Sequence, residues 1–259
     1  MIVAGLQLDS AWEDPSENLR RAELLAARAA AAGARLAALP EMFATGFSMA
    51  PERVAPHAGA IRDGLADIAR RHDLWLAGGY AEPGPEGGRP RNACSLVGPD
   101  GAEALRYHKI HPFSHAGEDA HYDGGRALPT ATVEGLRVTA LICYDLRFPE
   151  PFRTAAERTD LFLVVANWPA ARRDAWRTLL RARAIENQAY VLGVNRVGSG
   201  DGLDYAGDSA LIGPLGEVLA TCAEDAGVLL GTVDAASVVA ARARFSFLAD
   251  RRPEVYEGL

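Results

Sequence analysis

Apolar runs and helical patterns alternate along the N-terminal part of the chain. Ile2–Leu8 is a nearly continuous apolar run of strand length, as expected for a strand buried on both faces. Asp14 and Pro15 suit the start of a helix, and strong helix formers fill positions 17–32. The pattern continues with a strand at Arg35–Leu39, a helix at Ala58–His72 and a strand at Leu74–Tyr80. This alternation predicts a layered α/β domain.

Two later segments share one pattern: a short strand, a Gly-Pro-x-Gly turn and a second short strand. The turns are residues 98–101 and 213–216, and clusters of Gly and Pro are typical of tight turns. The flanking strands are expected at Asn92–Val97 and Glu103–Tyr107, and at Ala210–Ile212 and Glu217–Ala220. The repetition is consistent with two related halves in one sheet system.

The segment between these hairpins predicts a second set of strands. Apolar strands are expected at Arg137–Ile142, Asp160–Asn167 and Ala189–Asn195, and a helix at Arg172–Gln188. Because no linker or shift in composition interrupts the chain, we expect one domain over residues 1–259. The tail from Arg242 alternates arginine with aromatic residues, which favours packing on the body or on a partner subunit.

Composition and charge exclude several classes of protein. The 259 residues carry 27 Lys and Arg against 34 Asp and Glu, and no long basic run is present, which argues against a nucleic-acid surface. The apolar stretch Leu24–Leu39 contains two arginines and a glycine, so we expect no membrane span. The N-terminus shows no signal peptide, and a cytoplasmic protein is expected. Three cysteines without a CxxC spacing indicate neither a disulfide framework nor a metal site.

Three short stretches place reactive side chains directly after predicted strands. Glu41 follows the strand that ends at Leu39, and α/β proteins build their sites at the carboxyl ends of strands. A partly desolvated carboxylate there suits a general base, with an ordinary loop glutamate as the alternative. Lys109 lies between a strand and Pro112, where a fixed ammonium group could stabilise an oxyanion. An exposed surface lysine is the alternative.

The third stretch contains a candidate nucleophile. The strand at 137–142 runs straight into Cys143, and Pro149 begins a helix a few residues later. This is the outline of a strand–nucleophile–helix turn, in which backbone N–H groups and the helix N-terminus favour a thiolate. The alternative is that the free cysteine is a small buried hydrophobic residue.

Glu41, Lys109 and Cys143, in this order and each after a strand, resemble the nitrilase superfamily of carbon–nitrogen hydrolases. The resemblance covers essentially the whole chain and includes segments 167–169, 181–188, 195–198 and 207–209. It implies a four-layer α-β-β-α sandwich, a homodimer or higher homo-oligomer, and chemistry without a metal or organic cofactor. The segment at 143–149, Cys-Tyr-Asp-Leu-Arg-Phe-Pro, is similar to the amidase branch. Within that branch it is nearest to ω-amidases, which hydrolyse the terminal amide of 2-oxoglutaramate and related monoamides of short dicarboxylates.

The resemblance also implies roles for individual residues. Cys143 would attack the amide carbonyl to form a thioester, while Glu41 would carry protons and later activate water. Lys109 and the backbone N–H of Tyr144 would hold the oxyanion. Glu118 matches the family's second glutamate and would orient Lys109 and the substrate amide, with a plain loop acid as the alternative.

Arg147 matches the arginine that binds the substrate carboxylate in the ω-amidase branch. A guanidinium holds a carboxylate through two parallel hydrogen bonds, whereas an ion pair with Asp145 or Glu150 is the structural alternative. The remaining candidates for substrate binding are Tyr144, Tyr122, Phe43 and Trp168. Packing is an equal alternative for Tyr122 and Phe43. Pro112 departs from the family pattern, where leucine is more familiar, and alters the backbone beside Lys109.

Some alternatives remain open from the sequence. The histidines at 108, 111, 115 and 121 could suggest zinc, but no HExxH motif is present and we expect no metal. Cys94 and Cys222 are expected to be structural. Arg147 favours a small amide with an acidic acyl portion without fixing its length, so deaminated glutathione and N-carbamoyl compounds are alternative substrates. A non-catalytic binding protein on this fold would be expected to lack one of Glu41, Lys109 and Cys143, and all three are present.

Overall fold

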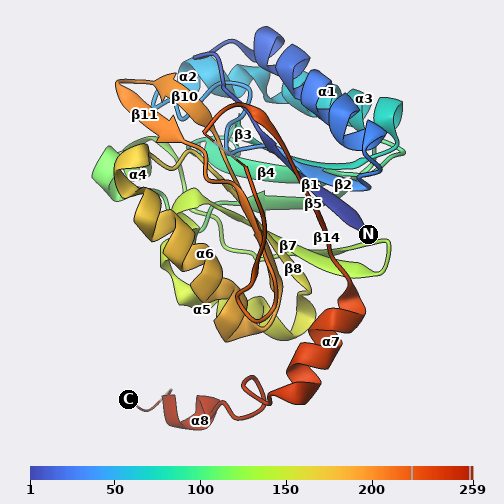
Figure 1. Ribbon diagram of the computed structural model, residues 1–259. Coiled ribbons are helices and arrows are strands. Elements are labelled where there is room, and N and C mark those ends of the chain that lie inside the picture. Colours follow the sequence, from blue (N-terminus) through green and yellow to red (C-terminus); the bar gives the residue numbers. More distant parts are fainter. Residues whose placement is uncertain (223, 257, 259) are drawn as a thin grey trace.

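The computed structural model describes residues 1–222, 224–256 and 258, and two facing six-stranded sheets form its core (Figure 1). The first sheet has the spatial order β14 (Gly227–Thr232), β1 (Ile2–Gln7), β2 (Leu36–Ala38), β3 (Trp75–Glu82), β4 (Arg91–Val97) and β5 (Glu103–His108). The second has the order β13 (Val218–Thr221), β12 (Ala210–Ile212), β9 (Tyr190–Asn195), β8 (Leu161–Ala166), β7 (Leu136–Ile142) and β6 (Thr130–Val133). A separate hairpin consists of β10 (Val197–Gly200) and β11 (Leu203–Ala206).

Helices cover the outer faces of both sheets and complete four layers (Figure 1). The first sheet is covered by α1 (Pro15–Ala31) and α3 (Ala58–His72), and the second by α5 (Pro149–Ala155) and α6 (Arg173–Asn187). The shorter or peripheral helices are α2 (Pro51–Val54), α4 (Glu118–His121), α7 (Ala235–Arg244) and α8 (Pro253–Tyr256). Turns of 3₁₀ helix are η1 (Ala55–His57), η2 (Ser114–Ala116), η3 (Cys143–Arg147), η4 (Ala156–Arg158) and η5 (Ala170–Arg172). The predicted four-layer α-β-β-α sandwich is confirmed.

Local chemistry explains where the elements begin and which faces they bury. The Asp14 carboxylate accepts a hydrogen bond from the backbone N–H of Glu17 at 3.1 Å, and this caps α1. Successive residues of β2 point to opposite faces: Leu36 and Ala38 pack between the sheets, and Ala37 packs toward the helices. Both faces are therefore buried, which accounts for the continuous apolar runs in the sequence.

The two predicted Gly-Pro-x-Gly hairpins lie in different sheets. One is β4–β5 in the first sheet, and the other is β12–β13 in the second. β14 was not predicted from the sequence, and it pairs antiparallel with β1 over a very long sequence separation. The predicted packing of the tail on the body is confirmed for its first part, because the Arg242 guanidinium donates to the carbonyl oxygens of Ala156 and Thr159, both at 2.8 Å.

The sheet topology determines where side chains can meet. In the first sheet β1, β2 and β3 run parallel, and in the second β7, β8 and β9 do so. The loops after β2, β7 and β8 therefore leave carboxyl ends of strands, the positions from which α/β folds build sites. Within the described part of the chain, no helix is long and apolar enough to cross a membrane.

Candidate active site

Glu41, Lys109 and Cys143, which each come shortly after a strand, meet between the two sheets. One carboxylate oxygen of Glu41, Oε1, accepts from Lys109 Nζ at 2.9 Å, and the other, Oε2, accepts from the backbone N–H of Asn167 at 2.8 Å. Cys143 Sγ lies 3.9 Å from the carbonyl oxygen of the same Asn167. Asn167, which directly follows β8, thus joins the candidate base to the candidate nucleophile.

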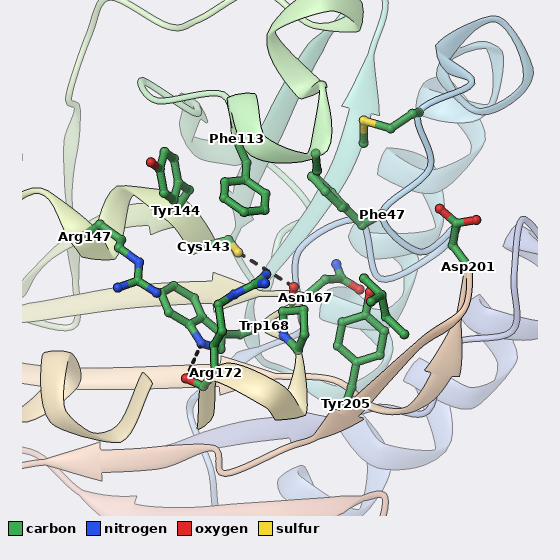
Figure 2. Close-up of a pocket in the computed structure, with 14 residues that line it drawn as sticks. Phe47, Phe113, Cys143, Tyr144, Arg147, Asn167, Trp168, Arg172, Asp201 and Tyr205 are labelled. Carbon is green, nitrogen blue, oxygen red and sulfur yellow. Dashed lines mark hydrogen bonds between the residues drawn. The ribbon is translucent and has the colours of Figure 1, made fainter. Parts of the chain in front are cut away.

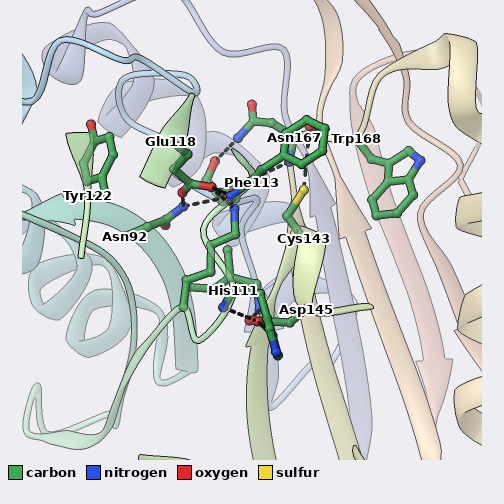
Figure 3. Close-up of polar contacts among 12 residues, drawn as sticks. Asn92, His111, Phe113, Glu118, Tyr122, Cys143, Asp145, Asn167 and Trp168 are labelled. Atoms are coloured by element: carbon green, nitrogen blue, oxygen red, sulfur yellow. Dashed lines mark hydrogen bonds and ion pairs between the residues drawn. The ribbon is translucent and has the colours of Figure 1, made fainter. Parts of the chain in front are cut away.

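Glu118 and Asn92 complete a buried polar cluster around Lys109 (Figure 3). Lys109 Nζ donates to Glu118 Oε2 at 2.7 Å, so Glu118 is not a solvated loop acid. Asn92 Nδ2 donates to both carboxylates, at 2.7 Å to Glu41 and 2.9 Å to Glu118. Asn92 was not predicted from the sequence, and the signal available was an amide near the start of the largely buried β4. All four side chains are buried, which makes each of these hydrogen bonds electrostatically strong.

Opposing charges determine the protonation of this cluster. Burial acts to lower the pKa of Lys109, but the negative charges of Glu118 and Glu41 outweigh it and hold that pKa above its ordinary value. Burial raises the pKa of Glu118, and the Lys109 charge only partly opposes this effect. Burial and the neighbouring Glu41 charge raise the pKa of the Cys143 thiol well above its ordinary value, against the opposing effect of Lys109. These shifts favour a neutral Cys143 thiol beside a charged Lys109, whereas the turn alone suggested a thiolate.

Cys143 occupies the sharp turn where β7 ends and η3 begins. Its φ of 46° lies in the left-handed region, which a residue with a Cβ adopts only when its surroundings hold it there. The helix α5 begins shortly afterwards at Pro149, as predicted. This geometry has the features of a nucleophile elbow, in which the reactive atom stands above the end of a strand.

Asp145 holds the Cys143 turn against the Lys109 loop. Its Oδ2 accepts from the Tyr107 hydroxyl at 2.7 Å and from the backbone N–H of Ile142 at 3.0 Å. Its Oδ1 lies 3.0 Å from the backbone nitrogen of His111, which donates to it, and 2.8 Å from His111 Nδ1. The Asp145 carboxylate is completely buried, and no ion pair with Arg147 is recorded among the described residues. Asp145 is therefore a tether between the two loops and not the partner of Arg147.

An open pocket leads to Cys143 (Figure 2). Three predicted substrate-binding residues line it: Tyr144, Arg147 and Trp168. Other lining residues were not predicted, and they include Phe47, Phe113, Arg172, Asp201 and Tyr205. The last two belong to the β10–β11 hairpin, which therefore contributes one wall. Aromatic side chains dominate this lining, and such walls bind the apolar part of a small ligand while a few polar groups orient it.

Phe43 and Tyr122 pack in the core instead of lining the pocket. Phe43 is completely buried in the cluster between the first sheet and its helices. Tyr122 is 1% exposed, and its hydroxyl donates to the Ser48 carbonyl oxygen at 2.8 Å. The packing alternative therefore holds for both residues.

The four clustered histidines do not converge on one point. His108 lies 2.5 Å from Glu82, His111 pairs with Asp145, and the His115 ring lies against Phe113. No group of His, Cys, Asp and Glu suitable for a metal ion occurs among the described residues. Cys94 is buried in the inter-sheet core within β4, and Cys222 lies outside the pocket.

Sequence comparison identifies the family to which this arrangement belongs. The sequence profile of the carbon–nitrogen hydrolase family matches residues 2–243. The chain belongs to the carbon–nitrogen hydrolase family. The predicted superfamily and enzyme class are thereby confirmed.

Individual relatives of this hydrolase are similar over most of their length. It is 44% identical to Omega-amidase YafV of Yersinia enterocolitica over 83% of this chain and 82% of that protein. It is 29% identical to the 2-oxoglutaramate amidase of Bacillus subtilis over 98% of both chains. A solved structure of a CN-hydrolase superfamily protein from Xanthomonas campestris superposes with a TM-score of 0.90 at 37% identity, covering 97% of each chain.

Proposed function

We propose that this hydrolase is an amidase of the ω-amidase type, which releases ammonia from the terminal amide of a small carboxylate-bearing substrate such as 2-oxoglutaramate. The observation that carries the proposal is the buried contact of Glu41 with Lys109 and Asn167 beside Cys143, at the base of a pocket that contains Arg147. The relatives named Omega-amidase YafV and 2-oxoglutaramate amidase support the choice of substrate.

The proposed reaction begins with proton transfer from Cys143 to Glu41. As the thiol proton leaves, Sγ forms a bond to the amide carbonyl carbon, and the carbonyl oxygen becomes an oxyanion. Glu41 then gives the proton to the leaving nitrogen, the carbon–nitrogen bond breaks, and ammonia departs to leave a thioester. Glu41 next takes a proton from water, whose oxygen attacks the thioester. The carbon–sulfur bond breaks, the acid leaves, and Glu41 returns the proton to sulfur.

Lys109 and Glu118 have supporting roles in this proposal. Charge moves from the thiol–carboxylate pair to the carbonyl oxygen during attack, and the Lys109 ammonium, with the Tyr144 N–H, stabilises it there. Glu118 fixes the direction of Lys109 Nζ through the 2.7 Å contact. Arg147 at the pocket rim receives the substrate's acidic end. The indole of Trp168 supports its guanidinium, whose carbon lies 4.9 Å from the ring centroid.

An ammonia-release screen tests the proposed activity. We expect the purified protein to hydrolyse 2-oxoglutaramate and other ω-monoamides faster than N-carbamoyl acids, deaminated glutathione or nitriles. Cys143→Ala should lower the rate by about 10³-fold or more, because the covalent step is lost. Cys222→Ser is the matched control, since Cys222 lies outside the pocket. Ammonia release that persists in Cys143→Ala would show that Cys143 is not the nucleophile.

We also propose the setting in which the enzyme operates. Residues 1–259 form one catalytic domain, which works in the cytoplasm, where reducing conditions preserve the Cys143 thiol. The functional unit is a homodimer. Exposed apolar side chains on α6, α7 and the tail support this assembly, namely Ile185, Val239, Phe247 and Tyr256.

A further inference from the structure

Arg172 is a second pocket-lining arginine that the catalytic mechanism does not use. It ends η5, immediately before α6, and its side chain is half-buried in the pocket above Cys143. In the part of the chain that the structure describes, its guanidinium forms no hydrogen bond or ion pair with the protein. The next arginines along the chain differ: Arg173 pairs with Asp208 and Glu224, and Arg177 pairs with Asp208. The guanidinium N–H groups of Arg172 therefore remain available to a ligand, whereas those of Arg173 and Arg177 bind carboxylates of the protein.

Aromatic rings support Arg172 and Arg147 without consuming their hydrogen-bond donors. The Arg172 guanidinium carbon lies 5.3 Å from the Phe113 ring centroid, and that of Arg147 lies 4.9 Å from the Trp168 centroid. A cation over a ring is held by the ring's negative face, so its N–H groups remain available in the plane of the guanidinium. Both arginines are thus positioned for a ligand with strong acceptor atoms.

Trp168 links the two arginines structurally. Its ring face supports Arg147, while its indole Nε1–H donates to the backbone carbonyl of Arg172 at 2.9 Å. The backbone N–H of Arg172 also donates to the Pro169 carbonyl oxygen at 3.0 Å. The segment after β8 therefore places Arg172 beside Trp168, and Trp168 in turn supports Arg147, which comes from the turn after β7 (Figure 2).

The charge balance of the pocket favours an anionic ligand. Asp201 is the carboxylate among the pocket-lining residues, and it lies on the exposed hairpin, across the view from Arg147 in Figure 2. No ion pair between Asp201 and either arginine is recorded in the described part of the chain. Two unpaired guanidinium groups leave a net positive charge here, which a carboxylate would partly neutralise.

We propose that Arg172 is a specificity-determining residue, which binds the substrate's remote carboxylate together with Arg147. This inference rests on the proposed amidase function and adds a second recognition group to it. Arg147 is exposed at the rim, whereas Arg172 is half-buried, so Arg172 makes the more desolvated and stronger contact.

Kinetics with matched substrates test the proposal. The acidic substrate is glutaramate, and the neutral comparison is valeramide, which lacks the carboxylate. Arg172→Met keeps most of the apolar stem and should lower kcat/KM for glutaramate by about ten-fold or more, chiefly through KM, with a much smaller loss for valeramide. Arg172→Lys should recover only part of the loss, because lysine lacks the planar fork. The control is Arg28→Met on α1, which removes the same charge far from the pocket and should leave both substrates unchanged. Equal losses for the two amides would show that Arg172 is structural and would overturn the proposal.

A binding measurement separates this inference from the proposed function. In Cys143→Ala protein, calorimetric titration with glutarate or 2-oxoglutarate reports carboxylate recognition without catalysis. We expect Arg172→Met to weaken this binding by about ten-fold or more. If both arginines hold one carboxylate, the double variant with Arg147→Met should lose less binding free energy than the sum of the two single losses. Unchanged affinity in Arg172→Met would overturn the inference even if hydrolysis is confirmed. Weakened affinity would support it even if a different amide proves to be the substrate.

Discussion

Lys109 is the only lysine of the chain, and the other 26 of its 27 basic residues are arginines. It is also 1% exposed and contacts two buried carboxylates. Since lysine is usually an exposed residue, the burial of the single one indicates a specific need for a compact ammonium group. A guanidinium would present a planar fork instead of one nitrogen that three acceptors can surround.

The single lysine allows its protonation to be measured directly. In protein labelled with isotopic lysine, the NMR signals of the side chain should remain those of the charged form well above the ordinary lysine pKa of about 10.4. Because the pKa in the folded state is raised, the ammonium stabilises the fold below the unfolded-state pKa, and this contribution is lost only as pH rises through the folded-state value. Glu118→Gln removes one carboxylate and should lower the pKa. A wild-type midpoint at or below the ordinary value would contradict the charge balance described for the cluster.

At the scale of elements, the Asp145 tether explains how two loops from different sheets keep a common geometry. The Cys143 turn follows β7 in the second sheet, and the Lys109 loop follows β5 in the first. Asp145 lies within the Cys143 turn, and its carboxylate accepts from Tyr107 of β5, from His111 of the Lys109 loop and from Ile142 of β7. Neither loop is held in this position by sheet pairing alone.

Asp145→Asn should therefore reduce both stability and turnover. The amide has one acceptor atom fewer and places its N–H₂ against other donors, so we expect a loss of about 2–3 kcal/mol in the free energy of unfolding. We also expect kcat to fall more strongly than KM rises, because the pocket itself is untouched. Tyr107→Phe is the matched control, since it removes a single hydrogen bond and should cost about 1 kcal/mol. Denaturant titration and steady-state kinetics measure these effects, and wild-type turnover in Asp145→Asn would disprove the tether.

Gly79 in β3 determines how closely the Glu41 loop approaches the sheet. A Cβ at this position would lie 2.7 Å from the backbone nitrogen of Met42 and 2.8 Å from the Cα of Glu41. These atoms cannot approach so closely, and therefore the loop or the strand must shift. Only glycine permits this contact with the backbone of the candidate base.

Gly79→Ala should displace Glu41 and lower kcat by about 10²-fold, since shifts of an ångström at a catalytic group have effects of this size. Gly59→Ala is the matched control, because a Cβ there meets nothing within 4 Å and the residue lies in α3. That variant should retain activity and gain up to about 1 kcal/mol in stability. Equal activity of the two variants would show that the position of Glu41 does not depend on Gly79.

At the scale of the whole molecule, the site exists only because two sheets face each other. Glu41, Lys109 and Asn92 come from the first sheet, whereas Cys143 and Asn167 follow strands of the second. The hydrogen bond from the Asn167 N–H to Glu41 joins residues 126 positions apart. Folding of both sheets is therefore required before the base and the nucleophile can meet.

The proposed homodimer can be tested by light scattering. The expected mass is twice the chain mass of 27.6 kDa. Placing Asp at Ile185 and Val239, which are 43% and 63% exposed on α6 and α7, should dissociate it if these helices form the interface. Leu24→Asp on the exposed side of α1 is the control, because Leu24 is similarly exposed but lies in the opposite outer layer. A wild-type mass of one chain would disprove the dimer, and an unaffected dimer would place the interface elsewhere.

The sequence alone determined the layered fold and the order of the principal candidate residues. Periodicity, caps and turn residues act over a few neighbouring positions, and so the helix at Ala58–His72 and the two Gly-Pro hairpins could be predicted closely. Glu41, Lys109 and Cys143 became candidates because each follows a predicted strand, and their order along the chain resembles the nitrilase superfamily. These features depend on residues that are close in sequence, and so they can be predicted from the sequence alone.

Tertiary structure alone decided which groups surround those residues. Asn92 joins both glutamates, Asp145 joins two loops, and Arg172 enters the pocket through its place after β8. It also showed that Phe43 and Tyr122 pack in the core. No local pattern distinguishes these outcomes, because burial, charge pairing and hydrogen bonding depend on contacts between the two sheets. The same reason favours a neutral Cys143 thiol: its pKa is raised by burial and by the charge of Glu41, which is remote in sequence and adjacent in space.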